Sequence, residues 1–146
     1  MQEPIASSEN ATPKDRERAM AAYLTMFATS AAGLPLPFIN FFAALAFHLF
    51  IKSSGPFVAF HSYQSMLSQL VVSVINGVAV VWLVWAIISD QFGTAFIAYA
   101  AGAVLCNIAY VIISLIAAYR AYKGRMIYFI FFGALAHRYA YGSGRF

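Results

Sequence analysis

Charged residues are almost absent between Ala19 and Tyr119, where Lys52 and Asp90 are the only ones. Over the whole chain of 146 residues, 62% are hydrophobic and 10% are charged. Soluble domains are roughly half apolar and a quarter charged, and a domain of this size buries only about two-thirds of its surface. So much apolar surface needs lipid around it, and we therefore expect an integral membrane protein.

Four apolar segments follow one another along the chain. They run from about Ala19 to Leu34, from Leu36 to Ile51, from Phe57 to Ser89 and from Thr94 to Tyr122. Between the first two, Gly33, Pro35 and Pro37 stop one helix and allow another to start. Each of these two segments has roughly 16 residues, or about 24 Å of helix, against a hydrocarbon core of about 30 Å. We predict a short helical hairpin that is followed by a longer one.

The later segments are long enough to cross a bilayer. Within the third segment, residues 70–88 are apolar, and Trp82 and Trp85 suit an aromatic belt at the far interface. After the fourth segment, the apolar run from Met126 to Ala136 is too short to span and is expected to lie in the interface or to re-enter it. The predicted fold class is all-α: a polytopic membrane protein with four transmembrane helices in two hairpins, the first one short, plus a C-terminal interfacial segment.

The distribution of basic residues favours four crossings over three. With four crossings, all nine Lys and Arg residues fall on one side: Lys14, Arg16, Arg18, Lys52, Arg120, Lys123, Arg125, Arg138 and Arg145. This positive-inside pattern places both termini in the cytoplasm and Asp90 on the other side. If residues 19–51 formed one kinked span, Lys52 would lie opposite the N-terminal basic cluster. The charge pattern argues against that alternative.

The domain organisation follows from the same segments. Residues 1–17 are polar and lack the basic and then apolar pattern of a signal peptide, so we expect a cytoplasmic tail that is disordered or bound by a partner. Near its end, Thr12 is expected to be the N-cap of the first helix, with Pro13 at the first helical position. Residues 18–123 form the predicted four-helix membrane domain, and residues 124–146 a cytoplasmic or interfacial tail.

A polar stripe begins at the entrance of the third segment. Helical spacing places on one face His61, Gln64, Ser65, Ser68, Gln69 and Asn76. Polar side chains at membrane depth face other helices or water rather than lipid. The stripe therefore either bonds to neighbouring helices or to water at the cytoplasmic interface, or lines a polar groove or pore vestibule. Asn76 and Asn107 lie within apolar runs and are expected to bond to each other across the third and fourth helices.

The residue types of catalytic and metal sites are scarce. The three histidines are far apart in the sequence and lack paired carboxylates, and no Gly-Lys-Ser/Thr phosphate loop is present. The single cysteine, Cys106, allows no intramolecular disulfide and is expected to be a buried hydrophobic residue. No nucleophile with a base and no pair of intramembrane carboxylates is visible. We expect no enzyme activity, no metal, no cofactor and no nucleic-acid partner.

The start of the third segment resembles a motif of a small bacterial four-helix membrane family of uncharacterised function. This family is related to the Tic-type component of chloroplast inner-envelope protein import. The matching residues are Pro56, Phe57, Val58, His61, Gln64 and Gln69, whereas Ser65 and Met66 stand where the family has Ala-Leu. Ala118, Ala121 and Gly124 resemble the end of the family's last span, and the proline of its tail is absent. The resemblance implies four transmembrane helices, cytoplasmic termini and, from the plant relatives, membership of a protein-translocation complex.

Together these features lead to a functional expectation. The chain is expected to be a non-enzymatic integral membrane protein, an accessory or structural subunit of a larger complex in the bacterial inner membrane. The alternative is a channel or a translocation-like transport component, which could act as a homo-oligomer. The expected partners are the bilayer, other membrane subunits or further copies, and anionic lipid at the basic cytoplasmic face. The expected contacts with a partner or a polar groove are His61, Gln64, Ser65, Ser68, Gln69, Asn76 and Asn107.

Overall fold

The computed structural model describes residues 11–31 and 38–142, and their regular structure is entirely helical. The elements are α1 (Pro13–Ala31), α2 (Ile39–Ile51), the short 3-10 helix η2 (Lys52–Ser54), α3 (Pro56–Ser89), α4 (Thr94–Tyr122) and α5 (Gly133–Tyr141). The all-α prediction is thereby confirmed for the described residues. Residues 1–10 of the predicted tail over residues 1–17, and the predicted hinge at Pro35 and Pro37, lie outside them.

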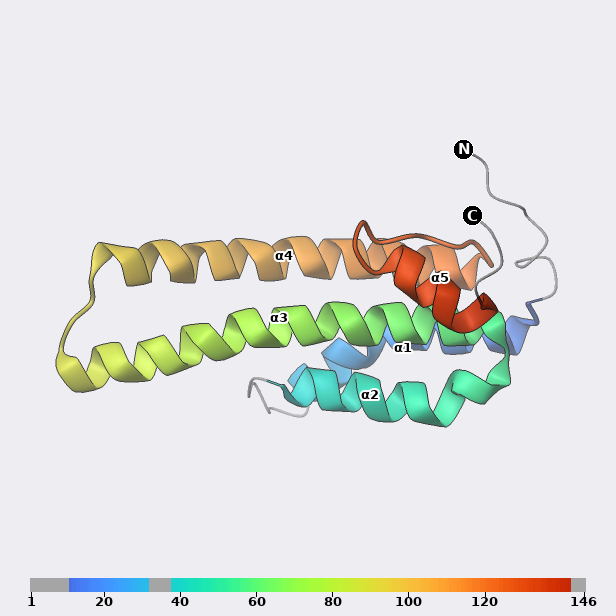
Figure 1. Cartoon of the computed structure of the whole chain (residues 1–146), viewed down its shortest axis with the longest axis horizontal. Coiled ribbons are helices and arrows are strands. Elements are labelled where there is room, and N and C mark those ends of the chain that lie inside the picture. The colour runs from blue at the N-terminus through green and yellow to red at the C-terminus, as the bar shows by residue number, and fades with distance from the viewer. Residues whose placement is uncertain (1–10, 32–37, 143–146) are drawn as a thin grey trace.

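The two longest helices, α3 and α4, form an antiparallel hairpin that runs the length of the molecule (Figure 1). Their bounds agree with the predicted segments, and local sequence explains why. Gly55, with φ 142°, and Pro56 at the first helical position start α3. Asp90, in the left-handed region with φ 51°, ends it before the turn to Thr94.

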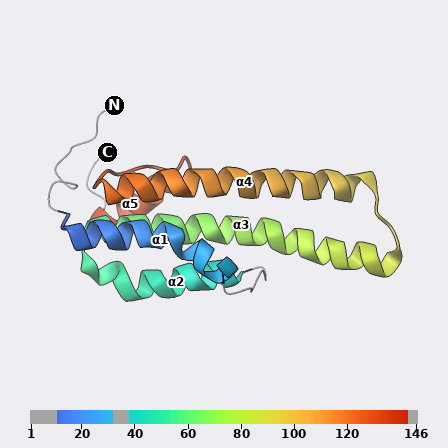
Figure 2. The same ribbon diagram turned by 180° about the vertical axis from the view of Figure 1, so that it is seen from behind.

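The other helices gather around one half of this hairpin (Figures 1 and 2). Helix α1 packs against both α3 and α4, whereas α2 and α5 pack against α3. The core there includes Tyr23, Phe57 and Ala117. The other half, which ends in the α3–α4 turn, is not covered by another of the described helices, and most of its large apolar side chains are exposed. They include Val74, Val81, Val84, Trp85, Ile87, Ile88, Ile97, Val104 and Leu105.

Within the part of the chain that the structure describes, two helices, α3 with 34 residues and α4 with 29, are long and apolar enough to cross a membrane. The prediction of four spans is not confirmed. Helix α2 has 13 residues, which gives about 20 Å, well short of a hydrocarbon core of about 30 Å. The charged residues of α1 lie in its first turns, from Lys14 to Arg18. Apolar residues in α1 and α2 also serve to pack against α3, and composition alone does not distinguish packing from spanning.

The two ends of the described chain differ in how closely they follow the predictions. Thr12 caps α1 as expected: the backbone N–H of Asp15 donates to Thr12 Oγ1 at 3.2 Å, and the Asp15 carboxylate accepts from the Thr12 N–H at 3.1 Å. The apolar run over 126–136 is not one segment. It divides into an irregular stretch over residues 126–132 and the start of α5 at Gly133. An added Cβ at Gly133 would lie 2.6 Å from Tyr128 Cβ, so the close return of the chain needs glycine there.

Candidate functional site

The first turns of α3 present a polar face that is buried inside the bundle. His61, Gln64 and Ser65 have no exposed surface, and Gln69 is 1% exposed. These side chains meet α1, and the hydrogen-bonded network that results is the polar cluster: Tyr23, Thr25, His61, Gln64, Ser65 and Gln69. The face predicted from helical spacing is therefore turned toward the chain's own helices rather than toward lipid.

Gln64 connects Tyr23 of the polar cluster to the stretch that leads to α5. Its Oε1 accepts the backbone N–H of Phe129 at 3.1 Å, which fixes the orientation of the amide. Its Nε2 donates to the carbonyl of Ile127 at 3.0 Å and to the hydroxyl of Tyr23 at 2.9 Å. One side chain of α3 thus binds both α1 and the backbone of the stretch that leads to α5.

The same bonds bear on the orientation of the hydrogen bond between Tyr23 and His61. Because the Tyr23 hydroxyl accepts from Gln64, its own proton is available to His61 Nδ1, which lies 3.0 Å away. With Tyr23 as the donor, a neutral His61 carries its proton on Nε2. That nitrogen has no hydrogen-bond partner among the described residues. The rings of Phe57 and Phe60 meet the imidazole edge-on, with centroids 4.6 and 5.0 Å away.

Gln69 lies at the end of the polar cluster that contains Thr25 and Ser65. Ser65 Oγ and Thr25 Oγ1 both donate their protons to the carbonyl of Ala22, at 2.7 and 2.9 Å. The two hydroxyl oxygens can then only accept, and they do so from Gln69 Nε2, at 3.0 Å for Thr25 and 3.2 Å for Ser65. This arrangement fixes the amide and leaves Gln69 Oε1 without a partner among the described residues.

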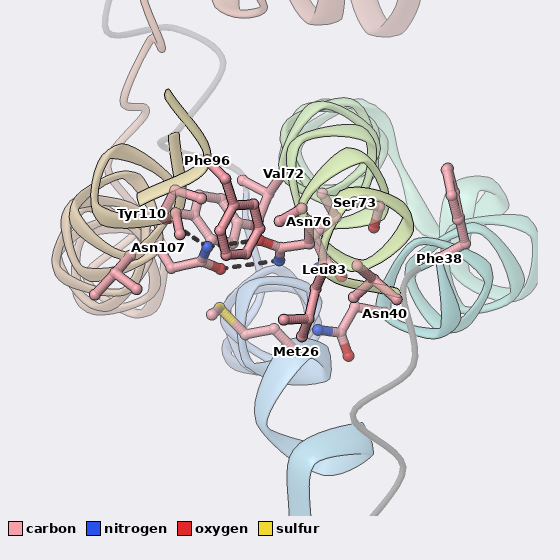
Figure 3. A pocket seen from close by; sticks show the side chains of 16 residues that line it. Met26, Phe38, Asn40, Val72, Ser73, Asn76, Leu83, Phe96, Asn107 and Tyr110 are labelled. Carbon is pink, nitrogen blue, oxygen red and sulfur yellow. Dashed lines mark hydrogen bonds between the residues drawn. The ribbon is translucent and has the colours of Figure 1, made fainter. Parts of the chain in front are cut away.

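A pocket of about 440 Å³ adjoins Gln69 between the first four helices (Figure 3). Its polar lining comprises Asn40, Gln69, Ser73, Asn76, Asn107 and Tyr110. Asn76 and Asn107 meet there, as predicted: Asn76 Nδ2 donates to Asn107 Oδ1 at 3.1 Å, and Asn107 Nδ2 donates to Asn76 Oδ1 at 2.7 Å. Ser68, the remaining member of the predicted stripe, lies 3.3 Å from the hydroxyl of Tyr110 instead.

A second polar group, which the sequence did not reveal, ties α2 to α3 and α5. His48 Nδ1 lies 2.8 Å from Ser62 Oγ, and His48 Nε2 lies 3.2 Å from the hydroxyl of Tyr139. The ring of Tyr139 stacks on Tyr63 with centroids 4.2 Å apart. A histidine within an otherwise apolar helix was the available signal for His48. Nothing local indicated that Tyr139 would be its partner.

These groups form a buried hydrogen-bonded network of His, Gln, Ser, Thr and Tyr side chains. Within residues 11–31 and 38–142, no group of three or more His, Cys, Asp or Glu residues lies close enough to hold a metal ion. The polar cluster joins α1, α3 and the approach to α5, so its main physical consequence is to fix how these elements pack.

Comparison with protein-family models identifies the family of the chain. A model of the magnetosome magnetite crystal formation protein family, MamF/MmsF, matches residues 14–135. The chain belongs to the MamF/MmsF family. The matched range begins in α1 and reaches the start of α5, so it contains the polar cluster and the whole α3–α4 hairpin. Searches of curated proteins and of solved structures return no match.

Membership of the MamF/MmsF family corrects one sequence-based inference. The relation to the Tic-type import component is wrong, because the family that covers the chain is a magnetosome family. The Pro-Phe-Val motif with His61 and Gln64 led to the wrong family because it is short. Its residues also have structural roles in this chain. Pro56 starts a helix, and the two polar residues belong to the polar cluster. A MamF/MmsF protein is a small magnetosome membrane protein involved in magnetite crystal formation.

Proposed function

We propose that the chain is a non-enzymatic accessory subunit that contributes to magnetite crystal formation from within a larger assembly of the magnetosome membrane. The observation that carries this proposal is the contrast between the two halves of the molecule. In one half, polar side chains bond to one another inside the bundle. In the other, apolar side chains of the α3–α4 hairpin face outward.

The burial of the polar cluster supports an accessory role. A catalytic acid, base or nucleophile must come within hydrogen-bond reach of its substrate. His61 and Gln64 are fully buried, and the hydrogen bonds of Gln64 are made to α1 and to the backbone near α5. Contact between these residues and a partner protein, as the sequence suggested, would require the bundle to open.

The proposed topology places the basic end of the bundle in the cytoplasm. Lys52 in η2, and Arg120 and Lys123 at the end of α4, lie at this end of the bundle. Asp90 lies at the opposite tip of the hairpin. In this arrangement α3 and α4 cross the bilayer, whereas α1 and α2 enter from the basic side and return to it. Reporter fusions after Ile51 and after Ala140 test the orientation. A non-cytoplasmic signal at either position would refute it.

The proposed assembly can be tested on the exposed hairpin. A photo-crosslinking residue at Val81 or Leu105, which are 71% and 67% exposed, should capture specific membrane proteins in magnetosome membranes. The matched control positions are Ala86 and Ala103 on the same two helices, which are buried and should capture none. Gentle-detergent purification with mass spectrometry should recover the same partners. If the exposed positions capture only lipid and no protein co-purifies, the chain acts alone and the proposal fails.

The channel alternative makes a different prediction for the same experiment. A homo-oligomeric channel would crosslink to copies of itself at Val81 or Leu105. No specific observation on the described residues favours it, because the polar stripe bonds mostly to the chain's own helices.

A further inference from the structure

A groove of about 680 Å³ lies at the C-terminal end of α4. Along the chain, its lining consists of two aliphatic residues, then a tyrosine, then three cationic residues. In chain order they are Leu115, Ile116, Tyr119, Arg120, Lys123 and Arg125. No carboxylate lines this groove, so its positive charge has no acidic partner within the lining.

The end of α4 brings the cations together through a specific backbone turn. The N–H of Arg125 donates to the carbonyl of Arg120 at 2.9 Å, and the N–H of Gly124 donates to the carbonyl of Ala121 at 2.9 Å. With Gly124 at φ 73°, this is a Schellman motif, which folds the chain back over the last helical turn. The Arg125 backbone thereby returns to the level of Arg120.

A fourth cation raises the positive potential nearby. The Arg16 side chain from α1 lies against Gly124, where an added Cβ would come 3.0 Å from Arg16 Nε. Arg16 Nε has no hydrogen-bond partner among the described residues. Cations at a helix C-terminus are stabilised by the helix dipole, but four cations in proximity also repel one another, and a bound anion would reduce that repulsion.

The position of the groove along α4 corresponds to a membrane interface. Tyr119 is 64% exposed, as expected of an aromatic residue at the level of lipid headgroups. Leu115 and Ile116, which are about half exposed, lie roughly one helical turn deeper, toward the apolar part of the hairpin. A phospholipid has the same order of groups along the membrane normal, with its phosphate above its acyl chains.

We propose that this groove binds an anionic phospholipid, with the phosphate among Arg120, Lys123 and Arg125 and an acyl chain along Leu115 and Ile116. Arginine and lysine are the usual protein groups that bind phosphate. A zwitterionic lipid fits less well because its ammonium group would need an acceptor, and the lining offers no carboxylate. The aliphatic floor of the groove favours a lipid over a free phosphate ion. This site does not depend on the proposed role in a magnetosome assembly.

The test separates a formed site from general attraction of the basic end to lipid. The full-length chain is reconstituted in phosphatidylcholine vesicles, and retention of labelled phosphatidylglycerol on the purified protein is measured. The groove variant is Arg120→Gln with Lys123→Gln. The matched control is Lys52→Gln with Arg138→Gln, which removes the same charge from exposed residues outside the groove.

The groove variant should weaken phosphatidylglycerol binding about 30-fold, given the usual contribution of each basic residue near a membrane surface, and the control should stay near the wild type. Ile116→Ser should also weaken binding, unlike Ile97→Ser, which changes a similarly exposed residue at the other end of α4. Equal losses in the two charge variants, or displacement of the lipid by inorganic phosphate at equimolar concentration, would overturn the proposal. Unchanged thermal unfolding shows that each variant is folded, and unaltered binding by a folded groove variant would overturn the proposal as well.

Discussion

Asn76 of α3 and Asn107 of α4 hold each other through two reciprocal amide hydrogen bonds, at 3.1 and 2.7 Å. Both lie in apolar stretches of the two helices that can span a membrane. Hydrocarbon offers no water to bond an unpaired amide. Each asparagine therefore supplies the hydrogen-bond partner that the other needs at that depth. This pair therefore sets the register of α3 against α4 beyond the reach of the polar cluster.

Replacing either asparagine by leucine should destabilise the hairpin, and replacing both should cost less than the sum. The coupling energy is expected at about 0.6–1.7 kcal/mol, the range of interhelical hydrogen bonds in membranes. A double-mutant cycle on the free energy of unfolding in mixed micelles measures it. Asn76→Leu combined with Ser89→Ala is the additive control, since Ser89 bonds to the Trp85 carbonyl of its own helix. Additivity for the asparagine pair would contradict this assignment.

Gln64→Met should release the stretch before α5. Methionine keeps the length of the side chain but leaves the Phe129 N–H and the Ile127 carbonyl without their partner. Each unsatisfied buried group costs about 1–3 kcal/mol, enough to raise local opening. Amide hydrogen exchange over residues 126–132 should accelerate at least tenfold. Gln69→Met is the matched control, because the bonds of Gln69 go to Thr25 and Ser65. Unchanged protection in Gln64→Met would show that the amide does not hold this stretch.

Tyr23→Phe should destabilise the whole bundle with little change in side-chain volume. Loss of the hydroxyl leaves Gln64 Nε2 with one acceptor fewer and removes the donor to His61 Nδ1. We expect a loss of about 1–3 kcal/mol in the free energy of unfolding, because both partners are fully buried. The control is Tyr119→Phe, at a residue that is 64% exposed, where no comparable change should occur. Equal stability of the two variants would contradict the bonding assigned to Tyr23.

The sequence predicted α3 and α4 well because their limits are local. Gly55 and Pro56 start α3, the Asp90 region ends it, and the apolar run of α4 is uninterrupted. The four predicted spans are not confirmed, because apolar residues in α1 and α2 also pack against α3. For the 13 residues of α2, length was the better guide, and it did predict a short first hairpin.

Apart from Asn107 of α4, the residues of the candidate site were predicted only on α3. Helical spacing placed His61, Gln64 and Gln69 on one face, and the structure brings them together. Their partners come from segments far along the chain, since Gln64 bonds to Ile127, 63 residues away. Such pairings depend on how helices pack, and no local pattern encodes them. The Asn76–Asn107 pair was predictable because each amide lies within an apolar run of its helix and has few other groups to hydrogen-bond.

Gly133→Ala should displace α5, whereas Gly102→Ala should not disturb α4. Both glycines are helical, but an added Cβ at Gly133 would lie 2.6 Å from Tyr128 Cβ and 2.7 Å from its Cα. At Gly102 nothing lies within 4 Å of the added atom, so alanine there should be neutral or slightly stabilising through its helix propensity. In Gly133→Ala, the backbone of α5 must shift, and the contact between Tyr139 and His48 should weaken. Hydrogen exchange over residues 133–141 should accelerate in that variant alone. If both variants kept α5 protected, the close approach of Gly133 to Tyr128 would not constrain this helix.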